Sequence, residues 1–166
     1  MQPSNDLSFD NIAKNIIKTN KFNELKKESH HGLTRYIHVM RVSKFTYKIS
    51  KFLHMDYVSA TRAALLHDYY TSNDMHDITE VKKLNIHPSI ARNNALKDFK
   101  LNEIEKNAIE AHMFPMGKTL PKYKESWLLT VVDKCVATYE QMKYKWKNAI
   151  AVYTIFLMNM ILFGQK

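Results

Sequence analysis

Apolar residues recur along most of this chain at steps of three and four, which is the period of an amphipathic helix. Alternating apolar and polar runs, which indicate half-buried strands, are few, and the chain has only 3 glycines and 4 prolines. The pattern therefore predicts an all-α fold, a single bundle of about six to eight helices. The predicted helices cover residues 6–18, 33–53, 56–69, 77–84, 88–98, 102–112, 122–144 and 146–163.

Several polar residues stand on faces that this periodicity predicts to be buried, where something other than bulk water must satisfy them. His38 is the first, because it is in phase with four apolar residues of its helix, namely Val42, Phe45, Ile49 and Phe52. The same rule predicts three more core-facing polar side chains, which are His67 after Ala60, Ala63 and Ala64, His112 after Leu101, Ile104 and Ala108, and Asp133 between Leu129 and Val136.

Two further polar residues join this set. Asp68 directly follows His67, and His87 precedes Pro88. Because proline is favoured as the first residue of a helix, we expect a helix to begin at Pro88 and the His87 imidazole to lie at its entrance. Each histidine taken alone is more simply explained as a hydrogen-bonded core residue. Together the imidazoles and carboxylates predict a metal site, and this mixture suits Fe, Mn, Co, Ni or Zn better than Ca or Mg.

The order of these residues resembles that of the HD-domain metal-dependent phosphohydrolases, whose signature is a His, then a His-Asp doublet, then a distant Asp. Here these are His38 in "RYIHVMRVS", His67-Asp68 in "ATRAALLHDYY" and Asp133 in "LLTVVDKCVA". His87 and His112 stand where the dinuclear branch of that family adds ligands, as in the symmetrical diadenosine tetraphosphate hydrolases. The chain is also similar to small stand-alone bacterial members, and it lacks the longer signature of the cyclic-di-GMP phosphodiesterases.

This resemblance implies hydrolysis of a phosphoester or phosphoanhydride bond, in a nucleotide or dinucleotide, by a water that one or two divalent transition-metal ions activate. It implies that Asp68 bridges two ions, whereas a single-ion site would leave His87 and His112 to contact the substrate. Two alternatives from other classes stay open, namely a dinuclear iron oxygenase of the same fold and a non-catalytic module that binds metal or nucleotide. The implied metal ligands are His38, His67, Asp68, His87, His112 and Asp133.

The charge of the chain agrees with a phosphorylated small molecule as partner. Lys and Arg number 25 against 16 Asp and Glu, a formal net charge of +9 that attracts anions. No nucleic-acid-binding signature accompanies this charge, so nucleic acid is not expected as partner. Segment 114–123 is irregular and is the predicted rim of the pocket. We expect Asp68, Arg41 and Lys118 to act in catalysis, and Arg35, Arg41, Lys118 and Tyr69 to contact the substrate, the tyrosine by stacking on a base.

The length of the chain predicts one domain over residues 1–166, with a core at 33–143 and an N-terminal and an apolar C-terminal helix packed on it. The single cysteine, Cys135, excludes an intramolecular disulfide and is predicted to be a packed residue. The single cysteine, together with an N-terminus unlike a signal peptide, predicts a cytoplasmic protein. The run "AIAVYTIFLMNMILFG" is short for a membrane span, so we expect a core helix or a homodimer surface, with membrane contact as the alternative.

Overall fold

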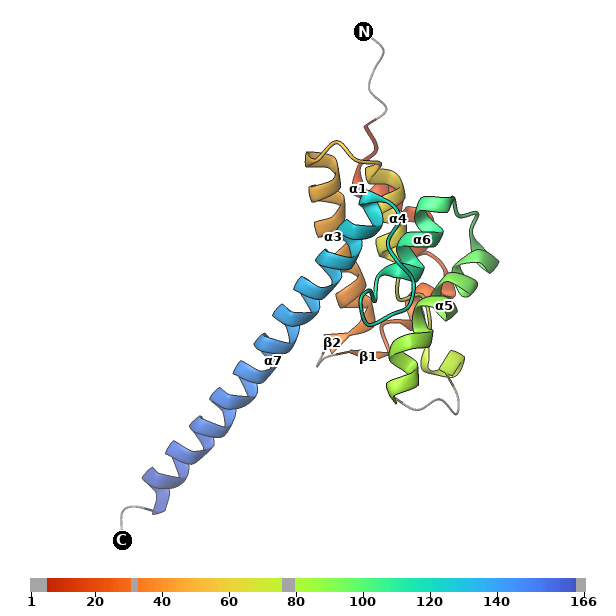
Figure 1. Ribbon diagram of the computed structural model, residues 1–166. Helices are drawn as coiled ribbons and strands as arrows, with labels where there is room; N and C mark the ends of the chain where they lie inside the picture. Colours follow the sequence, from red (N-terminus) through yellow and green to blue (C-terminus); the bar gives the residue numbers. More distant parts are fainter. Residues whose placement is uncertain (1–5, 31–32, 76–79, 164–166) are drawn as a thin grey trace.

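The computed structural model describes residues 6–30, 33–75 and 80–163. Across these residues the chain is a bundle of α-helices, which confirms the all-α prediction (Figure 1). A 3-10 turn, η1 Ser72–Met75, and an antiparallel pair of short strands, β1 Ser29–His30 and β2 Leu33–Thr34, accompany them. The helices are α1 Phe9–Ile17, α2 Asn20–Glu24, α3 Arg35–Phe52, α4 Tyr57–Leu66, α5 Glu80–Asp98, α6 Glu103–Ala111 and α7 Lys124–Phe163.

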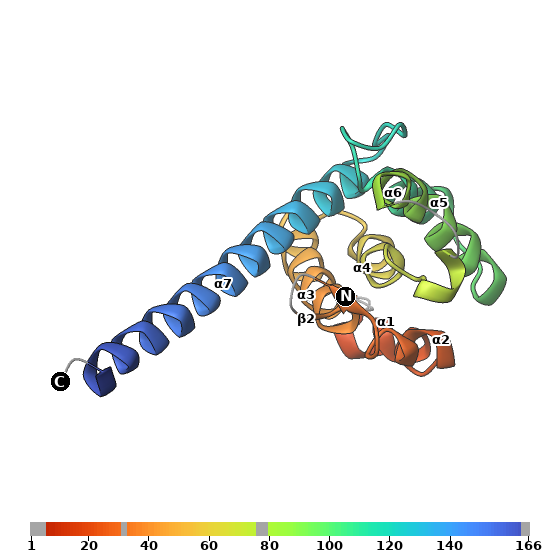
Figure 2. The ribbon, with the colours of Figure 1, turned by 90° about the horizontal axis from the view of Figure 1, so that it is seen from below.

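Helix α4 lies inside the bundle and contacts α1, α3, α6 and α7 (Figure 2). Its small residues Ala60, Ala63 and Ala64 are fully buried, so the neighbouring backbones can approach it closely. Asp56 caps its N-terminus by accepting a hydrogen bond from the Ser59 N–H. The helix ends at Leu66, which leaves the next two residues of the chain in the middle of the bundle.

Helix α6, like α4, has a capped N-terminus and ends inside the bundle. It begins with a capping box, in which the Asn102 side chain accepts from the Glu105 N–H at 2.8 Å and the Glu105 side chain accepts from the Asn102 N–H at 2.9 Å. The helix packs against α4, α5 and α7 and ends at Ala111. The C-terminal ends of α4 and α6 therefore carry their following residues into the same interior region.

The structure corrects the prediction that a helix begins at Pro88. Pro88 lies inside the continuous helix α5, and His87 therefore projects from the middle of that helix. A proline inside a helix costs about 3 kcal/mol, because it lacks an N–H and its ring crowds the preceding turn. Packing of α5 against α6 offsets this cost, since Pro88, Ala91 and Ala95 are all buried. Residues 77–79 of the predicted short helix lie outside the described residues.

Two other helix boundaries also differ from the prediction. The predicted N-terminal helix, residues 6–18, is α1, and a second helix that was not predicted, α2, follows it, because the Thr19 side chain accepts from the Phe22 N–H at 3.3 Å and caps its start. The two predicted C-terminal helices are the single helix α7, since no glycine or proline separates them. The described side chains of α7 after Glu140 are all exposed. The prediction that the apolar C-terminal run is a core helix is therefore wrong for these residues.

Three predicted buried residues lie on the surface. On α3, Phe45 is 49% exposed and Phe52 is 80% exposed, whereas Val42 is buried as predicted. The buried face of α3 carries the small polar residues Ser43, Thr46 and Ser50. The positions of its apolar residues therefore did not predict the buried face fully. Cys135 is also exposed rather than packed. Within the part of the chain that the structure describes, none of the helices combines the length and the apolar character needed to cross a bilayer.

Candidate metal centre

Two histidines stand directly after helix ends and are oriented by the same local contact. His67 follows α4 and His112 follows α6. The last carbonyl groups of a helix have no partner within it, so they can accept hydrogen bonds from nearby side chains. Nδ1 of His67 donates to the Ala64 carbonyl at 2.8 Å, and Nδ1 of His112 donates to the Ile109 carbonyl at 2.7 Å. Each Nε2 is thereby turned towards the other site residues, in the tautomer that binds a metal.

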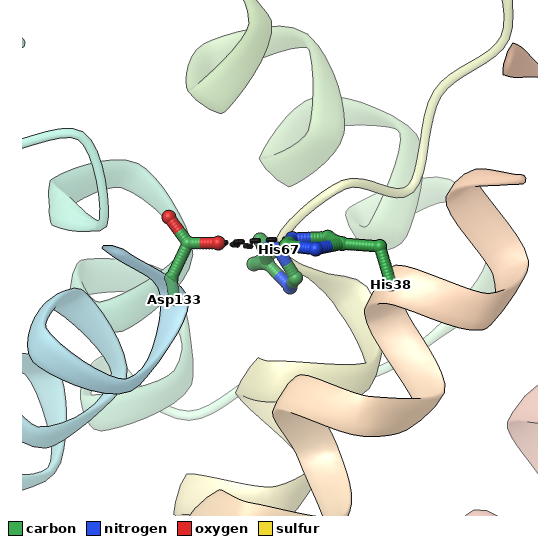
Figure 3. Close-up of side chains that lie close together, drawn as sticks. All are labelled: His38, His67 and Asp133. Carbon is green, nitrogen blue, oxygen red and sulfur yellow. Dashed lines mark hydrogen bonds and ion pairs between the residues drawn. The ribbon is translucent and has the colours of Figure 1, made fainter. Parts of the chain in front are cut away.

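His38, His67 and Asp133 form one group of ligand atoms, contributed by α3, the end of α4 and α7 (Figure 3). Oδ1 of Asp133 lies 3.0 Å from Nε2 of His38 and 3.5 Å from Nε2 of His67. Figure 3 shows the carboxylate facing both imidazoles. All three residues are buried, as their helical register predicted.

Asp68, His87 and His112 form a second group beside the first. Nε2 of His87 lies 3.0 Å from Nε2 of His112, and these two nitrogens lie 3.6 and 3.9 Å from Oδ1 of Asp68. The other oxygen of the same carboxylate, Oδ2, lies 4.0 Å from Nε2 of His67. Asp68, a member of the second group, therefore also faces the first group through its second oxygen.

The two groups could each hold a divalent metal ion. Within each group, the nitrogen and oxygen atoms that could bind an ion lie within 4.8 Å of one another. Nε2 of His67 is buried and accepts no hydrogen bond from any described residue, so its lone pair is available to a cation. The C-terminal ends of α4 and α6 carry partial negative charge and adjoin the same region, which favours a cation further.

One member of the site escaped the sequence analysis. Glu140, on α7, has a fully buried side chain, and its Oε2 lies 2.8 Å from Nδ1 of His38. Its other oxygen forms an ion pair with Arg41. Glu140 follows Asp133 by seven residues, which is two helical turns and the same helix face, and this spacing was the available signal. Arg41, predicted to contact phosphate, thus reaches the site through Glu140.

The histidines of the two ligand groups differ in their pKa. Burial opposes the charged form of His38, but its hydrogen bonds to Asp133 and Glu140 raise its pKa to about 10. Burial likewise opposes the charge of Asp133, yet His38 and His67 hold its pKa well below the usual range. Burial, together with the neighbouring His87 and His67, lowers the pKa of His112 to about 3. His112 is therefore neutral at pH 7, the form that binds a metal, whereas His38 is protonated and would release this proton on binding an ion.

Arg35 places a buried positive charge beside the second group. Its Nε lies 3.9 Å from Oδ2 of Asp68, and its guanidinium lies 3.9 Å over the ring of Tyr70. Nη1 donates to the Tyr70 carbonyl at 2.9 Å and lies 3.4 Å from the Glu28 carboxylate. The Tyr70 ring in turn lies 5.5 Å from the ring of His87. The structure thus brings Arg35 to the predicted site.

The remaining predicted substrate contacts have different positions. Tyr69 is fully buried, and its hydroxyl lies 3.0 Å from Thr19 Oγ1 and 2.9 Å from Asp98. Tyr69 is therefore a core residue with no open ring face for a base, and Tyr70 is the tyrosine beside the ligand atoms. Lys118 is exposed on the segment between α6 and α7. Lys134 contacts the site more directly, because its Nζ donates to the His112 carbonyl at 2.8 Å.

Comparison with known proteins agrees with this geometry. The family model of the HD domain matches residues 35–138, more than half of the chain. The chain belongs to the HD domain family. All six predicted ligand residues of the HD domain lie within the matched range, whereas Glu140 lies outside it. No curated protein and no solved structure matches the chain significantly.

Membership of this family has a chemical consequence. The HD domain belongs to a superfamily of metal-dependent phosphohydrolases that bind divalent metal ions, and the two His and Asp groups of this chain are suited to that role. The burial, the neutral imidazole of His112 and the position of Asp68 between the groups agree with it.

Proposed function

We propose that this HD domain hydrolyses a phosphoester or phosphoanhydride bond in a nucleotide or dinucleotide with two divalent transition-metal ions, drawn from Fe, Mn, Co, Ni and Zn. The position of the Asp68 carboxylate carries the proposal. Its Oδ1 faces His87 and His112 at 3.6 and 3.9 Å, while its Oδ2 faces His67 at 4.0 Å. One carboxylate with an oxygen towards each group is suited to bridge two cations.

In this proposal each group holds one ion. His38, His67 and Asp133 would hold the first, Asp68, His87 and His112 would hold the second, and Asp68 would be shared between them. Such a pair of ions supplies a water of lowered pKa as the nucleophile and neutralises charge on the phosphoryl oxygens. The protein residues keep the imidazole nitrogens directed inwards and exclude bulk water from the ligand atoms, which are buried.

The chain's own cations bind and orient the phosphate. Arg35 is held by Tyr70 and lies beside Asp68, so its charge is fixed in place where a phosphate bound at the ions would lie. Arg41, which pairs with Glu140, keeps its predicted phosphate-binding role in this proposal. Lys118, exposed on the segment between α6 and α7, keeps its role as well. The nucleotide class rests on the net charge of +9 and on the similarity of the six-residue pattern to dinucleotide hydrolases.

Metal content tests the site. We would measure metal by mass spectrometry on the full chain and on Asp68→Ala and His87→Ala, with His54→Asn as a control in an exposed loop. His54 has a φ of 51°, a conformation that asparagine also accepts. We expect about two ions in the wild type and the control, about one in His87→Ala and fewer than one in Asp68→Ala. Unchanged stoichiometry in His87→Ala rejects two ions, and unchanged metal in Asp68→Ala rejects the site.

Phosphate release tests the reaction. The metal-loaded chain would be assayed on a panel of nucleotides and dinucleotides under argon, with Mn²⁺ added. Release without dioxygen, lost in Asp68→Ala and kept in His54→Asn, supports hydrolysis. Dioxygen consumption by an iron-loaded chain, with no phosphate release, supports the oxygenase alternative and overturns the proposal. Metal binding with neither activity leaves a non-catalytic module and also overturns it.

A further inference from the structure

Helix α7 continues well beyond the bundle that its first half helps to form. Figures 1 and 2 both show the C-terminal half of α7 projecting away from the other helices. Residues 141–151 are all exposed, as are Thr154, Ile155 and Met158 farther along. From residue 141 to Phe163 the helix extends about 33 Å, at a rise of about 1.5 Å per residue. We call this segment, residues 141–163, the distal α7.

Three large apolar side chains of the distal α7 lie on one face. Met142 is 66% exposed, Trp146 is 72% exposed and Ile150 is 53% exposed. Their spacing of four residues places them one above another along the helix. Ile155 and Met158 are also exposed farther along, but the helical period places them away from this face. An exposed apolar surface of this extent indicates a binding partner, because single scattered residues would not line up in this way.

The charge of the distal α7 has a single sign. Its charged residues are Lys143, Lys145 and Lys147, all exposed, and no Asp or Glu follows Glu140 in the chain. Two copies of this helix side by side would bring lysines together without any acidic residue to pair with them, which disfavours a helical dimer. An anionic lipid surface has the opposite charge and accepts the apolar face, on which Trp146 is suited to the level of the headgroups.

We propose that the distal α7 is an interfacial helix that docks the HD domain on an anionic lipid surface. The helix lies in the plane of the headgroups, its apolar face towards the acyl chains and its lysines beside lipid phosphates. This role accounts for the exposure of residues 142–151. It is independent of the proposed hydrolysis, because the metal ligands all precede the distal α7 in the chain.

Tryptophan emission reports directly on the docking face. The chain has 2 tryptophans, so Trp127→Phe leaves Trp146 as the sole reporter. Trp127 is on the bundle and packs edge-on against Phe114, a contact that phenylalanine can keep. With vesicles of phosphatidylcholine and phosphatidylglycerol at about 7:3 we expect a blue shift of Trp146 emission and co-sedimentation of the chain. Vesicles of phosphatidylcholine alone should leave the emission of Trp146 unchanged.

A matched pair of triple variants separates the docking helix from net charge. Changing Lys143, Lys145 and Lys147 to Gln should weaken binding to the anionic vesicles by about 100-fold, with metal content unchanged. The control changes three exposed lysines of the bundle to Gln and should leave binding unchanged; it uses Lys14, Lys18 and Lys100. Equal loss in both variants, or no shift with anionic vesicles, overturns the proposal. A blue-shifted emission without vesicles and a doubled mass in light scattering also overturns it, in favour of a second copy of the chain.

Discussion

Nδ1 of His38 lies 2.8 Å from Oε2 of Glu140, so a carboxylate outside the matched family range orients one of the predicted metal ligands. The Glu140 side chain is fully buried, and Arg41 pairs with its second oxygen. Helix α7 thus contributes to the site twice, through Asp133 as a predicted ligand and through Glu140 as the partner of the predicted ligand His38. A ligand imidazole depends on the acceptor at its second nitrogen for its orientation and basicity.

Replacing Glu140 should therefore weaken metal binding. In Glu140→Gln the amide oxygen can still accept from His38, but the negative charge is lost. We expect the affinity for Zn²⁺ to fall about 10- to 100-fold, measured by competition with a chelator. Glu110→Gln is the control, because Glu110 also pairs with an arginine, Arg92, away from the predicted ligands. Equal affinities in both variants and the wild type would contradict the positioning role.

Arg41→Ala tests whether this arginine mainly supports Glu140. Removing it leaves the buried Glu140 carboxylate with His38 but without its arginine partner, so we expect the free energy of unfolding to fall by about 2 kcal/mol, with the urea m-value unchanged. Arg92→Ala, which removes the partner of the less buried Glu110, should lower it by less than about 1 kcal/mol. Loss of phosphate release without loss of stability would contradict the supporting role and leave phosphate binding as the role of Arg41.

Arg35→Lys tests the phosphate-binding role under the proposed function. Lysine keeps the charge but cannot stack its head group on the Tyr70 ring or present two parallel N–H groups. We expect kcat/KM for phosphate release to fall about 10- to 100-fold while the metal content stays at the wild-type value. A variant that retains full kcat/KM would exclude Arg35 from substrate binding.

Acid should weaken a contact between α2 and the η1 turn. Burial raises the pKa of Asp74, but the Thr71 N–H and the Lys21 ammonium outweigh it and lower this pKa. A carboxyl with a lowered folded-state pKa stabilises the protein above its unfolded pKa of about 3.9, and the stabilisation is lost as the pH falls below that value. Asp74→Asn should therefore be less stable than the wild type at pH 7. The difference in unfolding free energy should shrink below about pH 4, and a constant difference from pH 7 to pH 3 would contradict this.

Periodicity predicted the parts of the fold and site that depend on local register. The all-α class, the burial of His67 after Ala63 and Ala64, and the inward face of Asp133 between Leu129 and Val136 follow from residues three and four apart in one helix. The convergence of the six ligand residues into two groups agrees with the order of residues that resembled the HD family. The inward face of a single helix needs no knowledge of which helices are neighbours, whereas the convergence of residues from several helices was expected only from the resemblance.

Features that depend on helix neighbours were decided by tertiary packing. Pro88 is held inside α5 by packing against α6, Phe45 is exposed because α3 turns its small polar residues inwards, and Tyr69 is buried beside Thr19 and Asp98. The spacing of Glu140 from Asp133 indicates a shared helix face, but its contact with His38 is determined by the packing of α7 against α3. Local spacing determines which side chains share a helix face, but the element that covers that face is determined by contacts between residues distant in the chain.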